Sequence, residues 1–285
     1  PVKTLKGKVV SGKNGDLPRR ILVMLQFGFA IVLIIGTIVI LKQIDLAKGR
    51  DIGYDQEGLI SMTLTDDIRE NYNVIKNELI RKNLIVSMTR SNSRVTDINS
   101  NNFLGWPGKP ESQKVMFVTV ITGYDYAETM GAEMLMGRDF SKEFATDSSA
   151  IIINKSALDL MGIEGDPIGT SLDLWGKKRP LVGVIDNIMM GSPYEEVRPM
   201  FMTIDDWGGS VTIRLPATND MQDMLSGVQE VFEQYNPAYP FEYEFADIAF
   251  ERKYTTINLT RKLSTIFDIL TIFITGLGLF GLASY

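Results

Sequence analysis

The 285-residue chain contains no cysteine and no histidine, and these two absences exclude many kinds of active site. Without cysteine there is no disulfide scaffold, no thiolate nucleophile and no cysteine-ligated zinc or iron–sulfur centre. Without histidine there is no Ser-His-Asp triad and no histidine-bound metal cluster. Acid–base chemistry would depend on Asp, Glu, Lys or Tyr alone. We expect that the chain is not an enzyme, and we assign no catalytic residue, no cofactor site and no metal site.

Charged residues are almost absent from two long apolar runs, one near each end. Residues 21–41 carry no charge and a single amide, Gln26. At about 1.5 Å per residue, a helix of this length spans about 30 Å, the thickness of a membrane's hydrocarbon core. Residues 263–285 form a second run, in which Asp268 is the only charge. We expect two transmembrane helices. Because the second run is still apolar at its end and the sequence starts at Pro1, we also expect a fragment truncated at both ends.

The distribution of charge predicts the orientation of these helices. Residues 1–20 carry six Lys and Arg against one Asp, so the positive-inside rule makes them a cytoplasmic linker and puts residues 42–262 outside. Residues 42–262 carry 23 Lys and Arg against 33 Asp and Glu, a net charge of −10. An acidic domain is a poor partner for nucleic acid, and none is expected.

Residues 42–262 show mixed strand and helix patterns, which predict an α+β domain with helices near its two ends and a middle that is mostly β. Amphipathic helices are predicted at 68–82 and 219–235, the first capped by Asp66 or Asp67. The first helix lies between two strands and forms a βαβ-like start. A short helical turn is predicted at 125–130. The predicted strands are 58–65, 84–89, 115–121, 150–153, 171–175, 181–185, 200–204, 210–215 and 241–245.

Two connecting segments are informative. Residues 91–113 are rich in Ser, Asn, Gly and Pro and are predicted to be a long loop, with Trp106-Pro107 either anchoring it or forming an exposed contact. Residues 248–262 are predicted to be helical and continuous with the second apolar run. Such a helix would tie movement of the exterior domain to movement within the bilayer.

Several patterns imitate chemical motifs without their structural context. Residues 7–14 approach a P-loop, but Asn14 replaces the magnesium-binding Ser or Thr and no strand precedes it. Residues 276–281 match G-x-G-x-x-G inside an apolar run, where small residues instead favour close approach of another helix. Paired carboxylates are candidates for acid–base work, and nothing singles one pair out. The pairs are Asp66-Asp67, Glu195-Glu196 and Asp205-Asp206.

Eight motifs occur in order along the chain. They are RRILVMLQFGFAIVLIIGTIVILKQ (19–43), DIGYDQEGLI (51–60), MGRDF (136–140), IIINKSA (151–157), DPIGTSL (166–172), LVGVIDN (181–187), EVRPMF (196–201) and GLGLFGLASY (276–285). As an ordered set they resemble FtsX-like ABC transporter permeases with a MacB-type periplasmic core domain, in particular the second half of the long permeases of Bacteroidetes. One stretch departs from that pattern. Residues 185–189 read IDNIM where the family often has a Lys-Asp-Phe-His-like run, which puts any shared chemical role of this loop in doubt.

The resemblance implies a fold and a role. It implies a periplasmic α+β porter-like domain with a β-rich insert at about 124–204, in a multi-pass protein of the bacterial inner membrane. It implies a permease subunit that transmits ATP-driven conformational change from a cytoplasmic ABC ATPase to the periplasm, for export or envelope remodelling. The implied partners are that ATPase, the other half of the permease in the same chain or a dimer, membrane lipid and a periplasmic protein. ATP is not expected to bind this chain.

Two other functions share this layout. A transmembrane sensor with a periplasmic ligand-binding domain also has two spans around an exterior domain. A membrane-tethered envelope enzyme is the third possibility, restricted to Asp, Glu, Lys and Tyr for its chemistry. The basic segment before the first span is unusual for a sensor, and the glycine-rich second span favours tight helix packing.

Overall fold

The computed structural model describes residues 16–217 and 220–283, which belong to two compact units. The first contains the residues up to Gly49 together with those from Tyr254 onward, and we name it the helix pair. The second is Arg50–Lys253, which we name the globular domain. Each unit has its own architecture, built by different sequence patterns.

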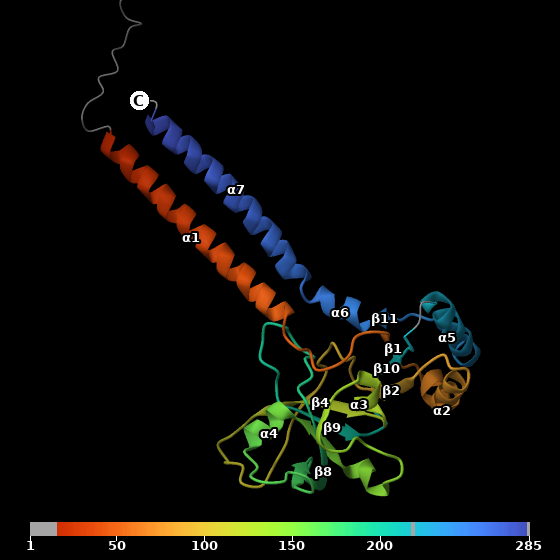
Figure 1. Ribbon diagram of the computed structural model, residues 1–285. Coiled ribbons are helices and arrows are strands. Elements are labelled where there is room, and N and C mark those ends of the chain that lie inside the picture. The colour runs from red at the N-terminus through yellow and green to blue at the C-terminus, as the bar shows by residue number, and fades with distance from the viewer. Residues whose placement is uncertain (1–15, 218–219, 284–285) are drawn as a thin grey trace, which may run out of the picture. The chain divides into compact units, whose positions relative to one another are not determined.

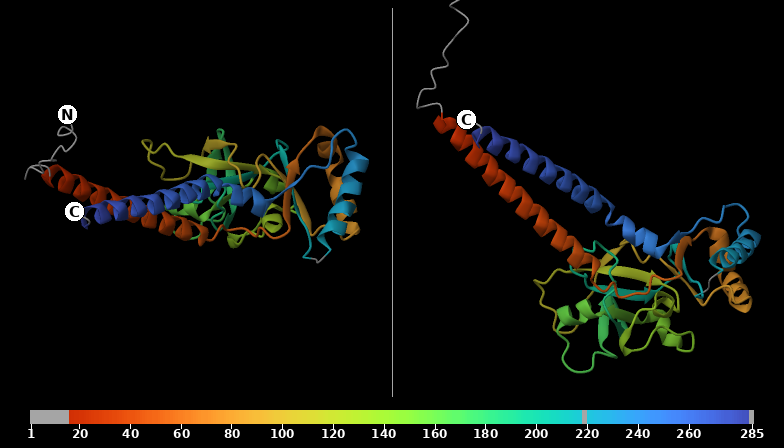
Figure 2. Two further views of the ribbon diagram at one scale, coloured as in Figure 1. Left: turned by 90° about the horizontal axis from the view of Figure 1, so that it is seen from above. Right: turned by 45° about the horizontal axis from the view of Figure 1, so that its top comes forward.

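The helix pair consists of α1 (Asp16–Lys48) and α7 (Thr255–Ala283). The two helices run antiparallel and side by side (Figure 1 and Figure 2). In the part of the chain that the structure describes, one segment, Ile21–Ala47 of α1, is long and apolar enough to cross a membrane. The predicted apolar helix near the N-terminus is therefore present, and it continues past Leu41.

The predicted continuous helix over 248–262 is wrong. Helix α6 (Ala246–Arg252) ends before α7 begins at Thr255, and Lys253 and Tyr254 form a turn between them. The N–H of Lys253 bonds to the Phe250 carbonyl at 3.0 Å, an i→i−3 contact that tightens the last turn. The Lys253 ammonium donates to two carbonyls of the globular domain, those of Met190 (2.5 Å) and Gly191 (2.7 Å). These contacts are made with residues distant in the sequence, so the local apolar pattern could not predict the break between the two helices.

One end of the sheet in the globular domain has the strand order β11-β1-β10-β2. Strand β10 lies between β1 and β2 and is antiparallel to both, so the predicted βαβ start is a split unit whose strands are not neighbours. The elements are β1 (Leu59–Thr63), α2 (Asp66–Arg81), β2 (Ser87–Ser91), β10 (Ser210–Arg214), α5 (Met221–Tyr235) and β11 (Glu244–Phe245).

The chain between β2 and β10 forms the rest of the sheet, in the order β4-β9-β6-β8-β5, with β3 beside β4 and β7 beside β8. The ladder between β4 and β2 is one residue pair long, Ser91 with Thr122. Its elements are β3 (Asn101–Phe103), β4 (Met116–Thr122), α3 (Tyr126–Met130), β5 (Met134–Gly137), a 3₁₀ helix (Ala145–Ser149), β6 (Ile151–Asn154), α4 (Lys155–Met161), β7 (Ser171–Leu174), β8 (Lys177–Ile185) and β9 (Met200–Ile204). The predicted α+β class is confirmed.

Three apolar clusters hold these elements together. Helices α2 and α5 pack against each other and cover one face of the four-stranded end, burying Ile75, Leu79 and Phe232. A second cluster around Tyr126 and Met202 includes residues from both parts of the sheet. The third cluster fills the β-rich part and includes residues of α4. Its fully buried members include Leu104, Phe117, Ile151, Leu181 and Phe201.

The structure refines three local predictions, which concern the loop over 91–113, the role of Trp106 and the cap of α2. The predicted loop over 91–113 contains the short strand β3, which pairs with β4. Trp106 anchors this loop, because it is 8% exposed and its ring meets Phe117 edge-on at a centroid distance of 5.8 Å. Thr65, not Asp66 or Asp67, caps α2, accepting a bond from the Ile68 N–H at 3.2 Å. The two aspartates lie in the first turn, where their charge stabilises the helix dipole.

Candidate functional site

The close contact within the helix pair forms at a glycine, as the small-residue pattern predicts. A Cβ placed on Gly278 of α7 would lie 3.3 Å from Oε1 of Gln26 on α1, whereas a Cβ on Gly276 would meet no atom within 4 Å. Thr275 on α7 is 7% exposed and Ala30 on α1 is 5% exposed, so both are buried. Small residues on both helices therefore let the backbones approach, and Gln26 fills the space beside Gly278.

A tyrosine fixes the start of α7 to the end of α1. Tyr254 is 3% exposed, and its hydroxyl donates to the carbonyl of Ala47 at 3.4 Å. Ile44, one turn earlier in α1, is also buried. Because α1 ends at Lys48 and α7 begins at Thr255, both covalent connections to the globular domain leave from the same end of the helix pair.

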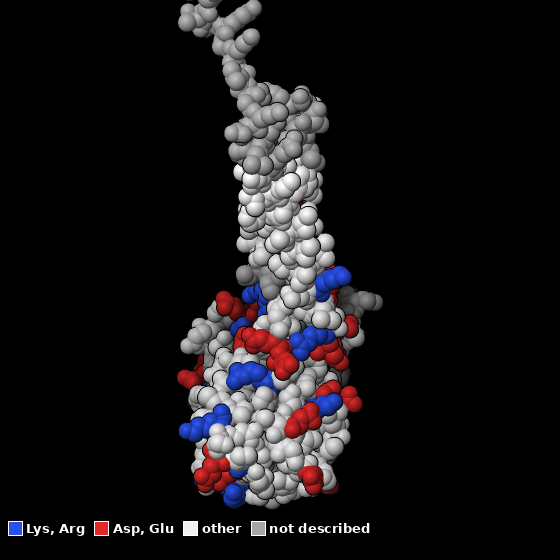
Figure 3. Space-filling view, turned by 90° about the vertical axis from the view of Figure 1, so that its left-hand side faces the viewer, with Lys and Arg blue, Asp and Glu red and all other residues white. Residues whose placement is uncertain are grey.

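The outer surface of the helix pair is apolar. Large side chains such as Leu22, Phe29 and Phe273 are each more than 60% exposed. Figure 3 shows the helix pair white for most of its length, whereas Lys, Arg, Asp and Glu side chains are frequent over the globular domain. Such a continuous exposed apolar surface is typical of a helix surrounded by lipid or by further helices.

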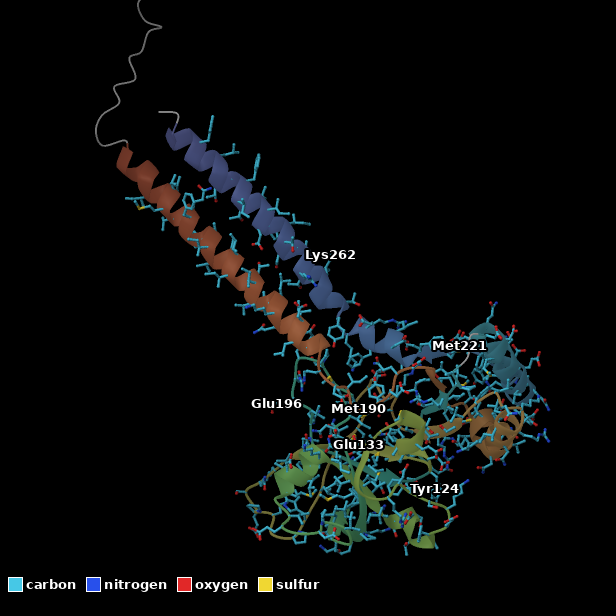
Figure 4. All side chains as sticks on the ribbon, in the orientation of Figure 1. Tyr124, Glu133, Met190, Glu196, Met221 and Lys262 are labelled. Carbon is cyan, nitrogen blue, oxygen red and sulfur yellow. The ribbon has the colours of Figure 1, made fainter. Side chains whose placement is uncertain are left out.

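The motif-like patterns of the sequence do not converge on one site. Residues 7–14 lie outside the described residues. The glycine pattern at 276–281 lies within α7, with no strand before it. Glu195 and Glu196 lie in the loop before β9, where Figure 4 labels Glu196, while Asp205 and Asp206 lie in the loop after β9. Within residues 16–217 and 220–283, no group of three or more acidic residues is arranged to hold a metal ion.

A cluster of cations that sequence analysis did not identify lines a cleft of the globular domain. The cleft lies between α2, β2 and the segment after β4, and its cavity volume is about 190 Å³. Tyr124, labelled in Figure 4, lies on its wall. We name it the basic cleft. Its lining residues are Arg69, Tyr72, Asn73, Lys76, Arg90, Gly123, Tyr124, Asp125, Lys142 and Ile204.

Arg214 is a deeply buried cation of the globular domain and has a structural role. Arg214 is 8% exposed and donates to the carbonyls of Asp55 (2.8 Å), Glu57 (2.5 Å) and Thr129 (3.1 Å). Burial lowers the pKa of its guanidinium, and the neighbouring Asp55 carboxylate opposes that shift. Arg214 thus joins the strand β10 to α3 and to the loop before β1.

The comparisons with known proteins return similar folds only. No protein-family model matches, and no curated protein matches. Among solved structures, the periplasmic region of MacB from Actinobacillus actinomycetemcomitans is similar at 13% identity, with a TM-score of 0.49, covering 70% of this chain and 94% of that one. The extracellular domain of the noncanonic ABC-type transporter YknZ from Gram-positive bacteria is similar at 11% identity, with a TM-score of 0.45, covering 65% and 97%. A domain of a putative permease protein from Porphyromonas gingivalis is similar at 14% identity, with a TM-score of 0.39, covering 56% and 75%.

Proposed function

We propose that this chain is part of the permease subunit of an ABC transporter. In this proposal both α1 and α7 cross the bacterial inner membrane and the globular domain lies in the periplasm. The chain is not itself an enzyme; a cytoplasmic ATPase partner hydrolyses ATP, and the permease transmits the resulting movement for export or envelope remodelling. The observation that carries the proposal is that both connections to the globular domain leave from one end of an antiparallel apolar helix pair.

The proposed transmission passes through two adjacent residues. Lys253 is held within the globular domain by the carbonyls of Met190 and Gly191, and Tyr254 is held within the helix pair by the carbonyl of Ala47. Only one peptide bond separates these two anchored side chains. A stiff continuous helix is therefore not required, because movement of α7 would reach the globular domain through this short covalent connection.

Membrane topology is the first test. The chain has no cysteine, so single cysteines at Lys13 and Asp97 can be labelled in intact cells with a membrane-impermeant maleimide. We expect Asp97→Cys to react in intact cells and Lys13→Cys to react only after lysis. The unmodified chain is the control, and it should stay unlabelled. Reaction of both cysteines from the same side would contradict the two-span arrangement.

Insertion of Gly-Gly between Lys253 and Tyr254 tests the transmission. In the complex with the ATPase, ATP should change hydrogen exchange in the globular domain of the unmodified protein. The insertion should abolish that change while ATP hydrolysis continues. A Gly-Gly insertion between Glu111 and Ser112, both exposed, is the matched control and should behave like the unmodified protein. An ATP response retained by the 253–254 insertion would refute transmission through this connection.

A sensor with a periplasmic ligand domain is the second candidate, and the basic cleft favours it. In a sensor, binding to the globular domain would change the spacing of α1 and α7 without any ATPase. In a permease, the ATP-dependent change requires the partner. Spin-label distances within the helix pair, measured with and without the ATPase, separate the two functions.

A further inference from the structure

The basic cleft has an excess of positive charge in a domain that is strongly acidic overall. Four cations line it, Arg69 and Lys76 from α2, Arg90 from β2, and Lys142 from the segment before the 3₁₀ helix. Asp125 is the one carboxylate among its lining residues. Since residues 42–262 carry ten more acidic than basic residues, a gathering of four cations is a local reversal of the domain's charge.

Two of the four cations are neutralised by carboxylates. The Lys76 ammonium lies 2.5 Å from Oδ2 of Asp125, and it also donates to the Met88 carbonyl at 2.8 Å. The Arg90 guanidinium pairs with the carboxylate of Asp206, a residue of the loop after β9. The Asp206 side chain is 70% exposed, and exposed ion pairs of this kind are weak.

The other two cations have no acidic partner among the described residues. Arg69 donates to the backbone carbonyls of Asp206 (2.6 Å) and Gly208 (2.8 Å), which are neutral acceptors that orient its guanidinium without cancelling its charge. Lys142 is exposed, and its ammonium lies 5.7 Å from the centre of the Tyr124 ring. These uncompensated charges come from segments more than 70 residues apart, brought together across the cleft.

Aromatic rings cover part of the wall between the cations. Arg90 lies 5.4 Å from the centre of the Tyr72 ring, whose hydroxyl is already bonded to the Met88 carbonyl at 2.9 Å. Tyr124 supplies a second ring beside Lys142. Cations beside aromatic rings give a surface that accepts both an anionic group and the planar or apolar body attached to it. The cavity volume of about 190 Å³ has room for a small anion and is below the roughly 300–1,000 Å³ of sites for drug-sized ligands.

We propose that the basic cleft binds a small solute through a carboxylate or phosphate group. The oxyanion lies between Arg69, Arg90 and Lys142, and the carboxylate of Asp206 occupies part of this position when no ligand is bound. Binding exchanges an exposed internal ion pair for bonds from three cations, which favours the ligand. This inference does not depend on the membrane role, because it concerns the globular domain alone.

Titration of the full chain in a neutral maltoside detergent tests the proposal. Inorganic phosphate and citrate are the two probes, and their relative affinities distinguish a phosphate from a carboxylate ligand. Sodium chloride at matched ionic strength controls for screening. We expect saturable binding of at least one probe, measured by calorimetry. Absence of saturable binding by both probes at low ionic strength would overturn the proposal.

Charge reversal inside and outside the cleft identifies the site. Lys142→Glu should weaken binding by at least about tenfold, since a charged hydrogen-bond partner becomes a repulsive one. Lys177→Glu makes the same change at an exposed position of β8 outside the cleft, and it should change the affinity less than about twofold. Equal effects of the two substitutions would show that only the overall charge matters, and would overturn the assignment.

Removing the carboxylate of Asp206 should have the opposite effect on the affinity for the probe. Asp206→Asn frees the Arg90 guanidinium and should tighten binding of the preferred probe several-fold. Asp205→Asn changes the net charge equally and leaves the Arg90 pair intact, so it is the matched control. Equal affinity of these two variants would refute the role of Asp206 as a competitor for the ligand position.

Discussion

The helix pair and the globular domain use the same apolar residue types in opposite ways. Ile35 of α1 is 56% exposed, and most large apolar side chains around it are exposed as well. Ile75 of α2 is fully buried, and most large apolar residues of the globular domain are buried like it. The difference teaches that the two units are built for different surroundings. Water drives the apolar residues of the globular domain inward, whereas the helix pair presents them to an apolar environment or to further helices.

The largest expected effect is a cavity in the core of the globular domain. Phe201→Ala removes a fully buried ring that contacts Phe117, and it should lower the free energy of unfolding by about 3–5 kcal/mol. Phe103→Ala removes a ring that is 55% exposed and should change stability by less than about 0.5 kcal/mol. Denaturant unfolding of the detergent-solubilised chain measures both. Similar losses for the two variants would contradict the placement of the core.

A charge on the helix pair should be almost as costly, but only in a membrane. Ile35→Asp puts a carboxylate in the middle of α1, and it should raise the free energy of membrane insertion by about 2.5–3.5 kcal/mol. Val74→Asp is the matched control, since Val74 is 50% exposed on α2 of the globular domain. It should have no effect on insertion. Unimpaired insertion of Ile35→Asp would remove the contrast between the two units.

A buried ion pair makes the stability of the globular domain depend on pH. The Arg138 guanidinium holds the pKa of the buried Asp147 below its ordinary value, at 2.8 Å between Nη2 and Oδ1, and the Ser141 N–H adds a bond of 2.9 Å. A pKa that is lower in the folded state than in the unfolded state contributes to stability. This contribution is fully present above the unfolded-state pKa of about 4, and it is lost as the pH falls through the folded-state pKa.

Asp147→Asn should therefore lower the free energy of unfolding by about 1–3 kcal/mol at pH 7, with a difference from the unmodified protein that shrinks below about pH 4. Burial raises the pKa of Asp139, so its contribution to stability changes with pH in the opposite direction. It is present in both proteins and cancels in their difference. A difference that is constant from pH 7 to pH 3 would show that folding does not lower the pKa of Asp147.

The smallest effect concerns the packing of α1 on α7. Gly278→Leu should weaken the contact by about 1 kcal/mol, because the added atoms meet the flexible end of Gln26 rather than backbone. Gly276→Leu enters open space and is the control. Spin labels at the exposed Ile31 and Ile274 report the spacing. A broader distance distribution is expected only for Gly278→Leu, and an identical distribution in both variants would contradict this interface.

The sequence predicts many of the elements, but it predicts neither β3, β5 and α4 nor the pairing of the strands. Local alternation predicts the strand over 58–65 and amphipathic spacing predicts the helix over 68–82, because neighbouring residues decide both. The position of β10 between β1 and β2 depends on pairing between strands more than 100 residues apart, which no local pattern records. The insert boundaries at 124 and 204 and the second membrane span remain predictions.

The basic cleft was hidden from sequence analysis for the same reason. Arg69, Arg90 and Lys142 are isolated cations in the sequence, each among acidic or neutral neighbours. Only the packing of α2 and the segment after β4 around β2 makes them neighbours in space. The turn at Lys253 and Tyr254 was missed because carbonyls of residues 47, 190 and 191 determine it, while the local pattern favours an uninterrupted helix.

The contact between Tyr254 and Ala47 has an evolutionary consequence. This contact holds the end of α1 beside the start of α7, so the points at which the chain enters and leaves the globular domain lie close together. Domains whose termini lie close together are the ones that tolerate insertion as a whole. A different fold with adjacent termini can replace residues 50–253 without disturbing the helix pair. Selection can thus exchange the globular domain while the helix pair stays as it is.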